Sequence, residues 1–395
     1  MKFFLFLIFI AIILPLCVAA LYYYRQGIHR WWFHSSNHRS RSARSAKADR
    51  HLILAFVDHF EPMYQNPTIE VERARVDRWV NDYPKLVKLF KDSDGCYPQH
   101  TFFYPEEEYR KEHLDKLAEL CRQGYGEIEV HLHHDRDTED GLREKLNRFT
   151  RILHEEHGAL PISPQTGMPA YAFIHGNWCL DNSGNNGEGC GVNNELTILR
   201  ETGCYVDMTF PSAPSPTQPI QTNSIYYAAD DPLHPKSHNL GCEVEVGGSP
   251  NGDLMLIQGP LGLNWRWRRW GIFPRLDNSD IRSNSPGLAQ RVDYWISRNV
   301  CVRGRPEWVF VKLHTHGTQE HDEAALLGAD AAQLYEYIDA EYIKRKGWKV
   351  HYVSAREMYN IAKAAEAGEM GDPNDYRNYI LKKPSFSANS LHSGF

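Results

Sequence analysis

Short apolar segments alternate with segments of helical periodicity between residues 51 and 366, and this alternation constrains the fold more than any other feature. The apolar segments are His51–Val57, Thr101–Tyr104, Ala170–Ile174, Tyr205–Met208, Trp308–Leu313 and Lys349–Val353. Between the first two, residues 68–91 carry apolar side chains at helical spacing. Repeated strand–helix units with apolar strands predict an α/β fold, in which helices cover a parallel sheet.

Polar residues follow several of these segments at the point where each predicted strand ends. They are Asp58 and His59, then His131, His133 and Asp135, then His175, Asp207, His314 and His316. The carboxyl ends of parallel strands lie at one edge of a sheet, and a (β/α) barrel carries its active site there. The sequence therefore predicts a functional site at this edge.

The stretch from Gly126 to Asp135 is the strongest indication of what that site holds. Side chains alternate along a strand, so Glu129, His131 and His133 share one face, and His134 points away from them. Imidazole and carboxylate groups suit a divalent cation. We predict one divalent metal ion, with zinc favoured and cobalt, nickel or manganese as alternatives. The predicted ligands are His59, His131, His133 and Asp135. The alternative interpretation is a surface strand whose histidines face water.

The first 24 residues predict a membrane anchor. Residues 3–22 are almost wholly apolar, interrupted by Pro15, and about 20 apolar residues can span a bilayer. A cleaved signal peptide ending near Ala19 or Ala20 is the alternative. Residues 25–49 are predicted to form a flexible basic linker. Positive charge after the span favours a body on the cytoplasmic side, whereas the substrate class inferred below favours an exported body, either periplasmic or extracellular.

The charge distribution excludes one class of partner. Residues 1–50 carry eight Lys/Arg and one acid, against 44 and 50 in the whole chain, so residues 51–395 carry a net charge of −13. A body this acidic argues against nucleic-acid binding. The eight cysteines form no C-x-x-C pair. Cys179 and Cys190 flank a loop rich in Gly and Asn, and either a disulfide or two free thiols fits them.

Two further regions depart from the strand–helix alternation. Residues 211–285 are rich in Pro, Ser, Asn and Gly and are predicted to be an insertion, with a Trp/Arg cluster at 265–270. Ser354 and Glu357 form a capping-box pattern that opens the last predicted helix. Residues 367–395 are predicted to be a loose polar tail.

The order of these motifs resembles the polysaccharide deacetylases of the NodB-homology type, over roughly residues 50–365. The family's first-strand motif of two adjacent Asp falls at Asp58-His59, and its third-strand ligands fall at His131 and Asp135. Its later motifs fall at residues 174–177, at 195–207, at 311–314 and at 347–357. The resemblance implies a distorted (β/α)7-type barrel over residues 50–366, a metal ion and removal of acyl groups from sugars.

Three departures from the family pattern stand beside the resemblance. His59 replaces the second Asp of the first motif, Asp135 replaces the second His of the third-strand motif, and the Arg of the next motif is missing. An alternative prediction is therefore a glycan-binding or assembly protein with a degenerate site. A glycoside hydrolase on the same sheet edge, using Asp58 with Glu61 or with Asp207, is a second alternative. A phosphoesterase is less favoured, because its H-x-H motif is expected on the first strand.

The leading hypothesis is a metal-dependent hydrolase that deacetylates a surface or extracellular polysaccharide. Asp58 is the predicted general base, and His314 is the predicted general acid, with His316 as its alternative. The predicted substrate-site residues are His175, Asn177, Trp178 and Asp207, of which Asp207 could also orient a catalytic histidine. The expected partners are a carbohydrate substrate and, through the N-terminal helix, a membrane.

Overall fold

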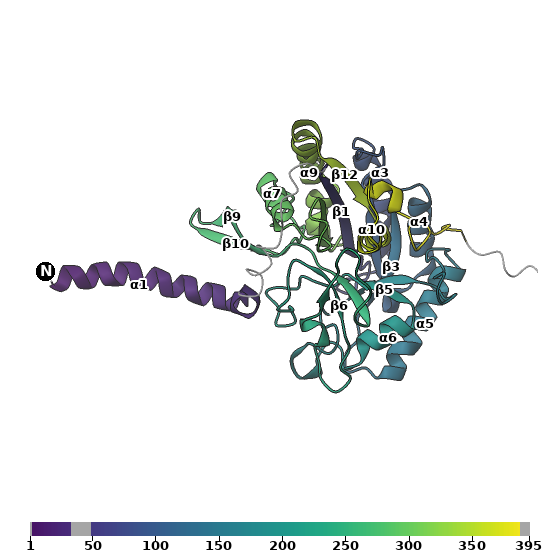
Figure 1. Cartoon of the computed structure of the whole chain (residues 1–395), viewed down its shortest axis with the longest axis horizontal. Coiled ribbons are helices and arrows are strands. Elements are labelled where there is room, and N and C mark those ends of the chain that lie inside the picture. The colour runs from purple at the N-terminus through teal and green to yellow at the C-terminus, as the bar shows by residue number, and fades with distance from the viewer. Residues whose placement is uncertain (1, 33–48, 388–395) are drawn as a thin grey trace, which may run out of the picture.

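The computed structural model describes residues 2–32 and 49–387 of the chain (Figure 1). Most of the predicted linker, residues 33–48, and the last part of the predicted tail, residues 388–395, lie outside the described residues. The body is built of α-helices and one large sheet whose strands are mostly parallel. The predicted α/β class is therefore confirmed.

β1 (His51–His59) is the second strand from one end of the ten-stranded sheet and pairs with three neighbours. It pairs in parallel with β11 (Trp308–Thr315) on one edge. Two strands share the other flank of β1: β12 (Lys349–Val353) pairs with its first half and β2 (His100–Pro105) with its second half. Every residue of β1 is buried, which explains why its sequence is almost continuously apolar.

Beyond β2 the sheet runs through four more parallel strands and then becomes antiparallel. The order is β3 (Gly126–Leu132), β4 (Tyr171–His175), β5 (Cys204–Asp207), β8 (Leu254–Ile257), β6 (Ile225–Ala228) and β7 (Cys242–Glu243). β8 is parallel to β5, whereas β6 is antiparallel to both β8 and β7. The region predicted as an insertion, 211–285, therefore supplies three strands of the main sheet as well as a separate hairpin of β9 (Gly262–Arg269) and β10 (Phe273–Asp277).

The described strands do not close into the predicted barrel. β11 stands at one end of the strand order and β7 at the other. Lys312 Nζ on β11 donates hydrogen bonds to the main-chain oxygens of Met208 and Phe210, just after β5. The fold is thus an open sheet in which a buried lysine of β11 bonds the chain that follows β5.

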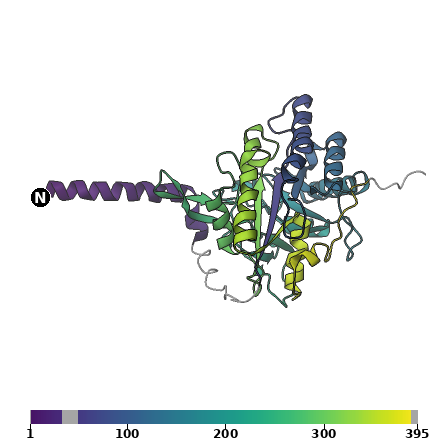
Figure 2. The ribbon, with the colours of Figure 1, turned by 90° about the horizontal axis from the view of Figure 1, so that it is seen from above.

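Helices cover the sheet (Figures 1 and 2). They are α3 (Ile69–Val87), α4 (Lys111–Arg122), α5 (Glu139–Glu155), α6 (Glu195–Glu201), α7 (Ala289–Arg298), α8 (Glu323–Leu326), α9 (Ala329–Tyr337) and α10 (Ala355–Glu366). Ser354 and Glu357 form the predicted capping box of α10. The sequence also predicts a helix that begins at Pro105 and another at about 323–346. The first begins at Lys111, after a single 3₁₀ turn, and the second is broken into α8, α9 and a π-helical segment.

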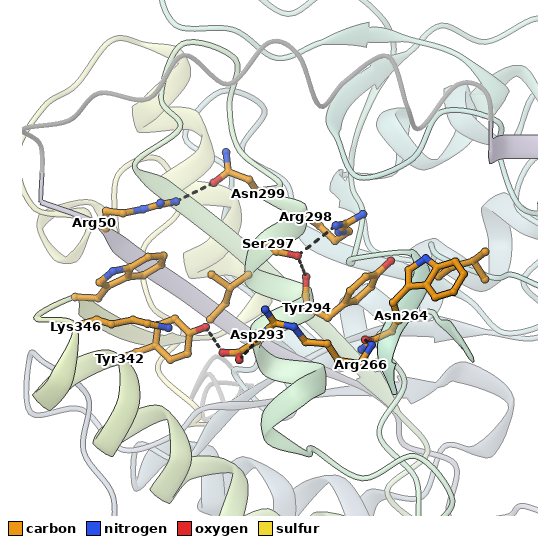
Figure 3. A pocket seen from close by; sticks show the side chains of 14 residues that line it. Arg50, Asn264, Arg266, Asp293, Tyr294, Ser297, Arg298, Asn299, Tyr342 and Lys346 are labelled. Atoms are coloured by element: carbon orange, nitrogen blue, oxygen red, sulfur yellow. Dashed lines mark hydrogen bonds and ion pairs between the residues drawn. The ribbon is translucent and has the colours of Figure 1, made fainter. Parts of the chain in front are cut away.

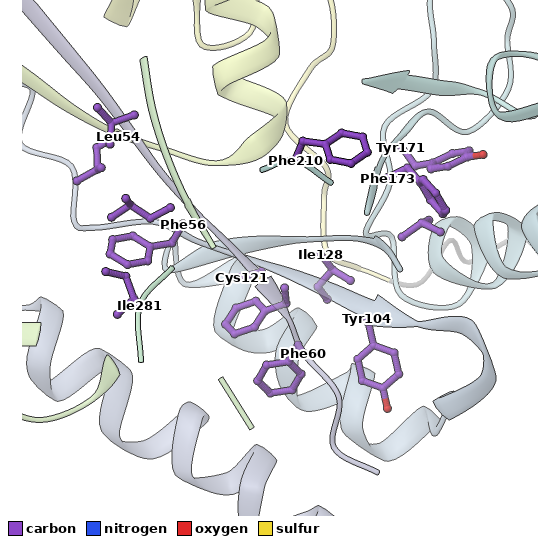
Figure 4. Close-up of a cluster of buried hydrophobic side chains, with 14 of the residues drawn as sticks. Leu54, Phe56, Phe60, Tyr104, Cys121, Ile128, Tyr171, Phe173, Phe210 and Ile281 are labelled. Carbon is purple, nitrogen blue, oxygen red and sulfur yellow. The ribbon is translucent and has the colours of Figure 1, made fainter. Parts of the chain in front are cut away.

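Successive residues of β1 belong to two different cores. Leu54 and Phe56 lie in the larger core, which the sheet shares with α3, α4 and α5 (Figure 4). Ile53, Ala55 and Val57 lie in the smaller core, which includes apolar side chains of α10. Because side chains alternate along a strand, consecutive residues at the end of β1 point to opposite sides of the sheet.

The N-terminal helix α1 (Lys2–Arg25) projects from the body beside the β9–β10 hairpin (Figures 1 and 2). Tyr23 Oη donates a hydrogen bond to the main-chain oxygen of Pro274 on β10 at 3.3 Å. Within the described residues, no helix meets both the length and the hydropathy needed to cross a bilayer. The predicted transmembrane anchor is therefore not confirmed.

The segment predicted as a loose tail packs on the body as far as it is described. Arg377 is buried, and its guanidinium bonds the carboxylates of Asp92 and Asp94 at 2.9 and 3.0 Å. Asn360 on α10 donates to the main-chain oxygens of Arg377 and Leu381 at 2.8 Å each. The prediction of a loose tail is wrong for residues 367–387, because buried polar groups of the body bond its backbone.

Candidate metal centre

Three side chains that can bind a metal converge at the carboxyl ends of β1 and β3. His59 ends β1, Glu61 follows it by two residues, and His131 lies on β3. One ligand atom from each lies within 4.8 Å of the others, and all three residues are buried. Glu61 Oε1 is 3.2 Å from His131 Nε2 and 3.9 Å from His59 Nδ1. We call these three residues the first metal group.

The end of β1 brings His59 and Glu61 to the same side. Phe60, between them, points into the larger core and packs edge-to-face on Trp79 with ring centroids 5.9 Å apart. Thr318 Oγ1 donates to the main-chain oxygen of Glu61 at 2.7 Å and holds this turn. Residues two apart on an extended chain share a face, so anchoring Phe60 directs both neighbours away from the larger core.

The hydrogen bond behind His131 directs its second nitrogen toward Glu61. Nδ1 lies 2.9 Å from the main-chain oxygen of Ile174, and because a carbonyl only accepts, Nδ1 is the donor. Nε2 therefore presents either a proton or a lone pair to the Glu61 carboxylate. Metal-binding histidines commonly have such a carbonyl partner behind them, which fixes the ring and its tautomer.

His59 is the least satisfied member of the group. Neither of its ring nitrogens has a hydrogen-bond partner among the described residues, although the residue is 1% exposed. Burial and the neighbouring imidazoles of His316 and His131 hold the pKa of His59 well below its ordinary value, so the ring is neutral. An unpaired buried polar group costs about 1–3 kcal/mol. A neutral imidazole with a free lone pair is the form that binds a metal ion.

His133 joins the group from the solvent side. Its Nε2 lies 3.4 Å from Glu61 Oε1, and its Nδ1 lies 2.5 Å from Glu107 Oε1. Burial opposes protonation, but the bonds to Glu107 and Glu61 outweigh it and raise the pKa of His133 to about 10. The histidine bonds in turn hold the pKa of Glu61 well below its usual range, despite burial. The ring packs on Gly176, where a Cβ would lie 2.4 Å from His133 Cδ2.

Aromatic rings enclose His59 on both sides. Its ring stacks on Trp178 and on His316, with centroids 4.6 Å apart in each pair. Trp178 has φ = 60°, which is rare for a bulky residue. Arg282 donates to His316 Nδ1 at 2.9 Å, and burial lowers the pKa of His316 to about 4. The ring of His314 lies 5.2 Å from that of Trp178. The predicted residues His59, His131, His133, His314, His316 and Trp178 therefore do come together.

Asp58, the predicted base, lies on the other side of β1. Its Oδ2 is 2.8 Å from His100 Nε2, and its Oδ1 accepts from the main-chain N–H of Gly317 at 2.6 Å. Gly317 is required there, since a Cβ would lie 2.1 Å from Asp58 Oδ2. Adjacent strand residues point to opposite faces, and so the structure separates Asp58 from His59.

Four other predicted site residues have partners elsewhere. Asp135 Oδ1 accepts from the main-chain N–H of Gly189 at 2.7 Å and is not among the ligand groups of the described residues. Asn177 Nδ2 donates to the main-chain oxygens of His134 and Gly189. Asp207 accepts from the amide and hydroxyl of Thr209. His175 follows Phe173 of the larger core by two residues and belongs to a second cluster, described below.

The sequence interpretation missed one member of the first metal group, Glu61, and two residues that bond histidines beside it, Glu107 and Arg282. Glu61 was considered only as a glycosidase carboxylate, yet its spacing of two residues from His59 places it on the same face. Glu107 follows the carboxyl end of β2, which is a position that the strand-end rule covers. Arg282 comes from the region treated as an insertion, and no pattern in the sequence relates it to His316.

The opposite edge of the sheet carries a different, open pocket (Figure 3). Arg50 precedes β1 and Trp348 precedes β12, so the pocket opens at the amino ends of these strands. Its cationic lining residues are Arg50, Arg266, Arg298 and Lys346, and Asp293 accepts hydrogen bonds within it. It contains no member of the first metal group.

His51 and His351 also lie at that opposite edge, with Asp372. His51 Nδ1 lies 2.9 Å from His351 Nε2, and His351 Nδ1 lies 2.6 Å from Asp94 Oδ2. Hydrogen bonds among these residues account for the cluster without an ion.

Comparison with known proteins adds no identification: no family model matches the chain, and no curated protein matches it significantly.

Proposed function

We propose that the chain is a metal-dependent hydrolase that removes acetyl groups from a carbohydrate. The observation that carries this proposal is the buried group of His59, Glu61 and His131, in which the His59 nitrogens have no other partner among the described residues. The donor set of two imidazoles and one carboxylate is typical of catalytic zinc, and zinc is the metal we propose. The open, curled sheet would then be a divergent form of a (β/α) barrel.

A divalent ion held by His59, Glu61 and His131 would polarise the acyl oxygen and lower the pKa of a water molecule. His133 is the proposed proton-transfer residue, because its side chain is 32% exposed and Glu107 holds its Nδ1. The water oxygen would bond to the acyl carbon, and the bond from that carbon to the sugar nitrogen or oxygen would break. His133 would give its Nε2 proton to the leaving atom and would take up a proton from the attacking water, whose oxygen stays in the released acetate.

The aromatic surface of Trp178 supports a carbohydrate substrate. The indole is partly exposed and stacks against His59. Sugar rings pack their C–H faces on such surfaces, so Trp178 would place an acetylated sugar over the first metal group. The strained backbone at Trp178 is consistent with a residue held in position for function.

A glycan-binding protein without turnover is the second candidate. Asp58, the carboxylate in the position of the family's general base, has both oxygens bonded on the far side of β1. Without another base, the metal group would hold a ligand but would not activate water. The two candidates differ in one measurable property, which is release of acetate.

The deciding experiment compares the full-length protein with the Glu61→Gln and His131→Ala variants. Each zinc-loaded protein is incubated with acetylated xylan and with N-acetylglucosamine oligomers, while acetate release and zinc content are measured. We expect turnover by the wild type, and both variants should lose about one equivalent of zinc and at least about 100-fold in activity.

The matched controls are Glu155→Gln and His234→Ala, which alter exposed residues and should keep zinc and activity. The glycan-binding candidate would be favoured if the two variants lose zinc and the wild-type protein binds the sugars but releases no acetate. Equal zinc content in Glu61→Gln, His131→Ala and the wild type would contradict the metal centre itself.

A further inference from the structure

We propose that the chain binds a second, structural zinc ion through His134, His175, Cys190 and Glu195. One ligand atom from each of the four lies within 4.8 Å of the others, and all four residues are buried. They come from the segment after β3, the end of β4, the following loop and the first residue of α6. The site shares no residue with the first metal group and does not depend on the proposed activity.

The donor set and its spacing fit a closed tetrahedral site. Glu195 Oε1 lies 3.1 Å from His134 Nε2 and 3.7 Å from His175 Nε2, and Glu195 Oε2 lies 3.4 Å from Cys190 Sγ. Ligands at ordinary zinc bond lengths, arranged as a tetrahedron, are about 3.4–3.6 Å apart. Four protein ligands leave no position for a substrate, so the ion would be structural.

The hydrogen bonds around the cluster leave one of its ligand nitrogens unused. His175 Nε2 is buried without a hydrogen-bond partner among the described residues, whereas His134 Nδ1, on the far side of its ring from Glu195, lies 3.5 Å from Asp137 Oδ2. The amide of Asn177 lies 3.2 Å from His175 Nδ1 and donates to it. Coordination through Nε2 would place the ring proton on Nδ1, so this amide would have to turn away. The adjacent Gly176 gives the backbone that freedom.

Main-chain N–H groups point at the sulfur and at the carboxylate, while burial and the neighbouring Glu195 carboxylate raise the pKa of the Cys190 thiol well above its ordinary range. The main-chain N–H groups of Asn182 and Val192 donate to Cys190 Sγ at 3.3 and 3.4 Å. The N–H of Asp181 donates to Glu195 Oε2 at 2.5 Å. A zinc ion would balance the charge that the thiolate and the carboxylate would carry once both bind it.

The ion would secure the long connection between β4 and α6. This connection, residues 176–194, contains a single 3₁₀ turn and several residues with positive φ, among them Trp178, Asp181 and Asn182. Loops of this length without regular structure are uncommon unless something fixes them. Because Trp178 lies three residues after His175, the ion would also hold the indole against His59.

Cobalt substitution of the full-length protein tests the proposal directly. Cobalt bound by Cys190 gives a sulfur-to-metal charge-transfer band in the near ultraviolet, which the first metal group cannot give because it has no cysteine. We expect this band, about two metal equivalents in the wild type, and loss of about one equivalent with the band in Cys190→Ser. Zinc removal should also increase proteolytic cleavage within 176–194.

Cys179→Ser is the matched control, since Cys179 lies in the same loop, is a free thiol and is outside the cluster. It should retain both equivalents and the band. Absence of the band from the cobalt-loaded wild type, or its persistence in Cys190→Ser, would overturn the proposal. The wild-type spectrum decides even where a variant fails to fold. Loss of the ion from the first metal group in Glu61→Gln should leave this band unchanged, so either proposal can be refuted without the other.

Discussion

Asp58 and His59 are neighbours in the chain, yet they lie on opposite faces of β1. His59 stacks with Trp178 and His316, whereas Asp58 bonds His100 and the amide of Gly317. A motif read as a pair of functional residues is thus divided by the alternation of a strand. At this scale, the bonds of each side chain determine what a substitution does.

An Asp58→Asn substitution is expected to destabilise the protein and leave its metal content unchanged. The amide oxygen can still accept from Gly317, but an amide nitrogen facing His100 is a weaker partner than a buried carboxylate, and this should cost about 1–3 kcal/mol. Urea unfolding and zinc analysis would measure the two effects. Unchanged stability with complete loss of acetate release would instead establish Asp58 as the base.

The His316 imidazole is expected to make the protein sensitive to acid. Its pKa falls from 6.5 to about 4, first because of burial, with the nearby Arg282 adding to the effect. Above pH 6.5 the ring is neutral in the folded and unfolded chains. Between pH 6.5 and 4 the unfolded chain takes up a proton that the folded chain does not, so stability is lost as pH falls, by about 3 kcal/mol from this residue.

Unfolding free energies of His316→Gln measured from pH 6.5 to 4 test this expectation. The variant should lose less stability than the wild type over that range, while His234→Gln, at an exposed position, should follow the wild type. Parallel curves for His316→Gln and the wild type would show that His316 is protonated in the folded protein.

At the scale of secondary-structure elements, local sequence patterns predicted most of what the structure contains. The apolar runs mark β1, β2, β4, β11 and β12, and the capping box marks the start of α10. Two elements differ for local reasons. Glu106–Glu108 form a 3₁₀ turn before α4, and a π-helical segment replaces the last part of the helix predicted at 323–346.

The sequence could indicate the residues of the metal group only where they alternate along a strand or lie at its carboxyl end. His131 was found because it lies on one strand, His133 because the alternation continues one residue past the end of that strand, and His59 because it ends another. Asp135 was wrongly included among the ligands that converge, since it lies three residues after the strand ends at Leu132 and the period of two does not extend that far. Cys190 and Glu195 join His134 and His175 through a loop without periodicity, so no pattern could indicate that contact.

At the scale of the whole molecule, a buried lysine links β11 to the chain that follows β5. Lys312 is fully buried on β11, and its Nζ donates to main-chain oxygens of Met208 and Phe210, beyond β5. Burial lowers the pKa of Lys312, and the nearby carboxylate of Asp207 opposes this effect. The sequence showed Asp207 at a strand end, but the sheet curvature that brings Lys312 near it arises from contacts between distant segments.

The expected effect of Lys312→Met is a loss of about 3–5 kcal/mol in the free energy of unfolding, because the substitution leaves Asp207 without its cation and two buried carbonyls without their donor. Urea unfolding would measure it, with Lys344→Met at an exposed ion pair as a control that should change by about 1 kcal/mol or less. The double variant Lys312→Met/Asp207→Asn should recover part of the loss, since it removes the uncompensated charge. A loss below about 1 kcal/mol in Lys312→Met would mean that packing of the smaller core, not this lysine, holds β11 near the chain that follows β5.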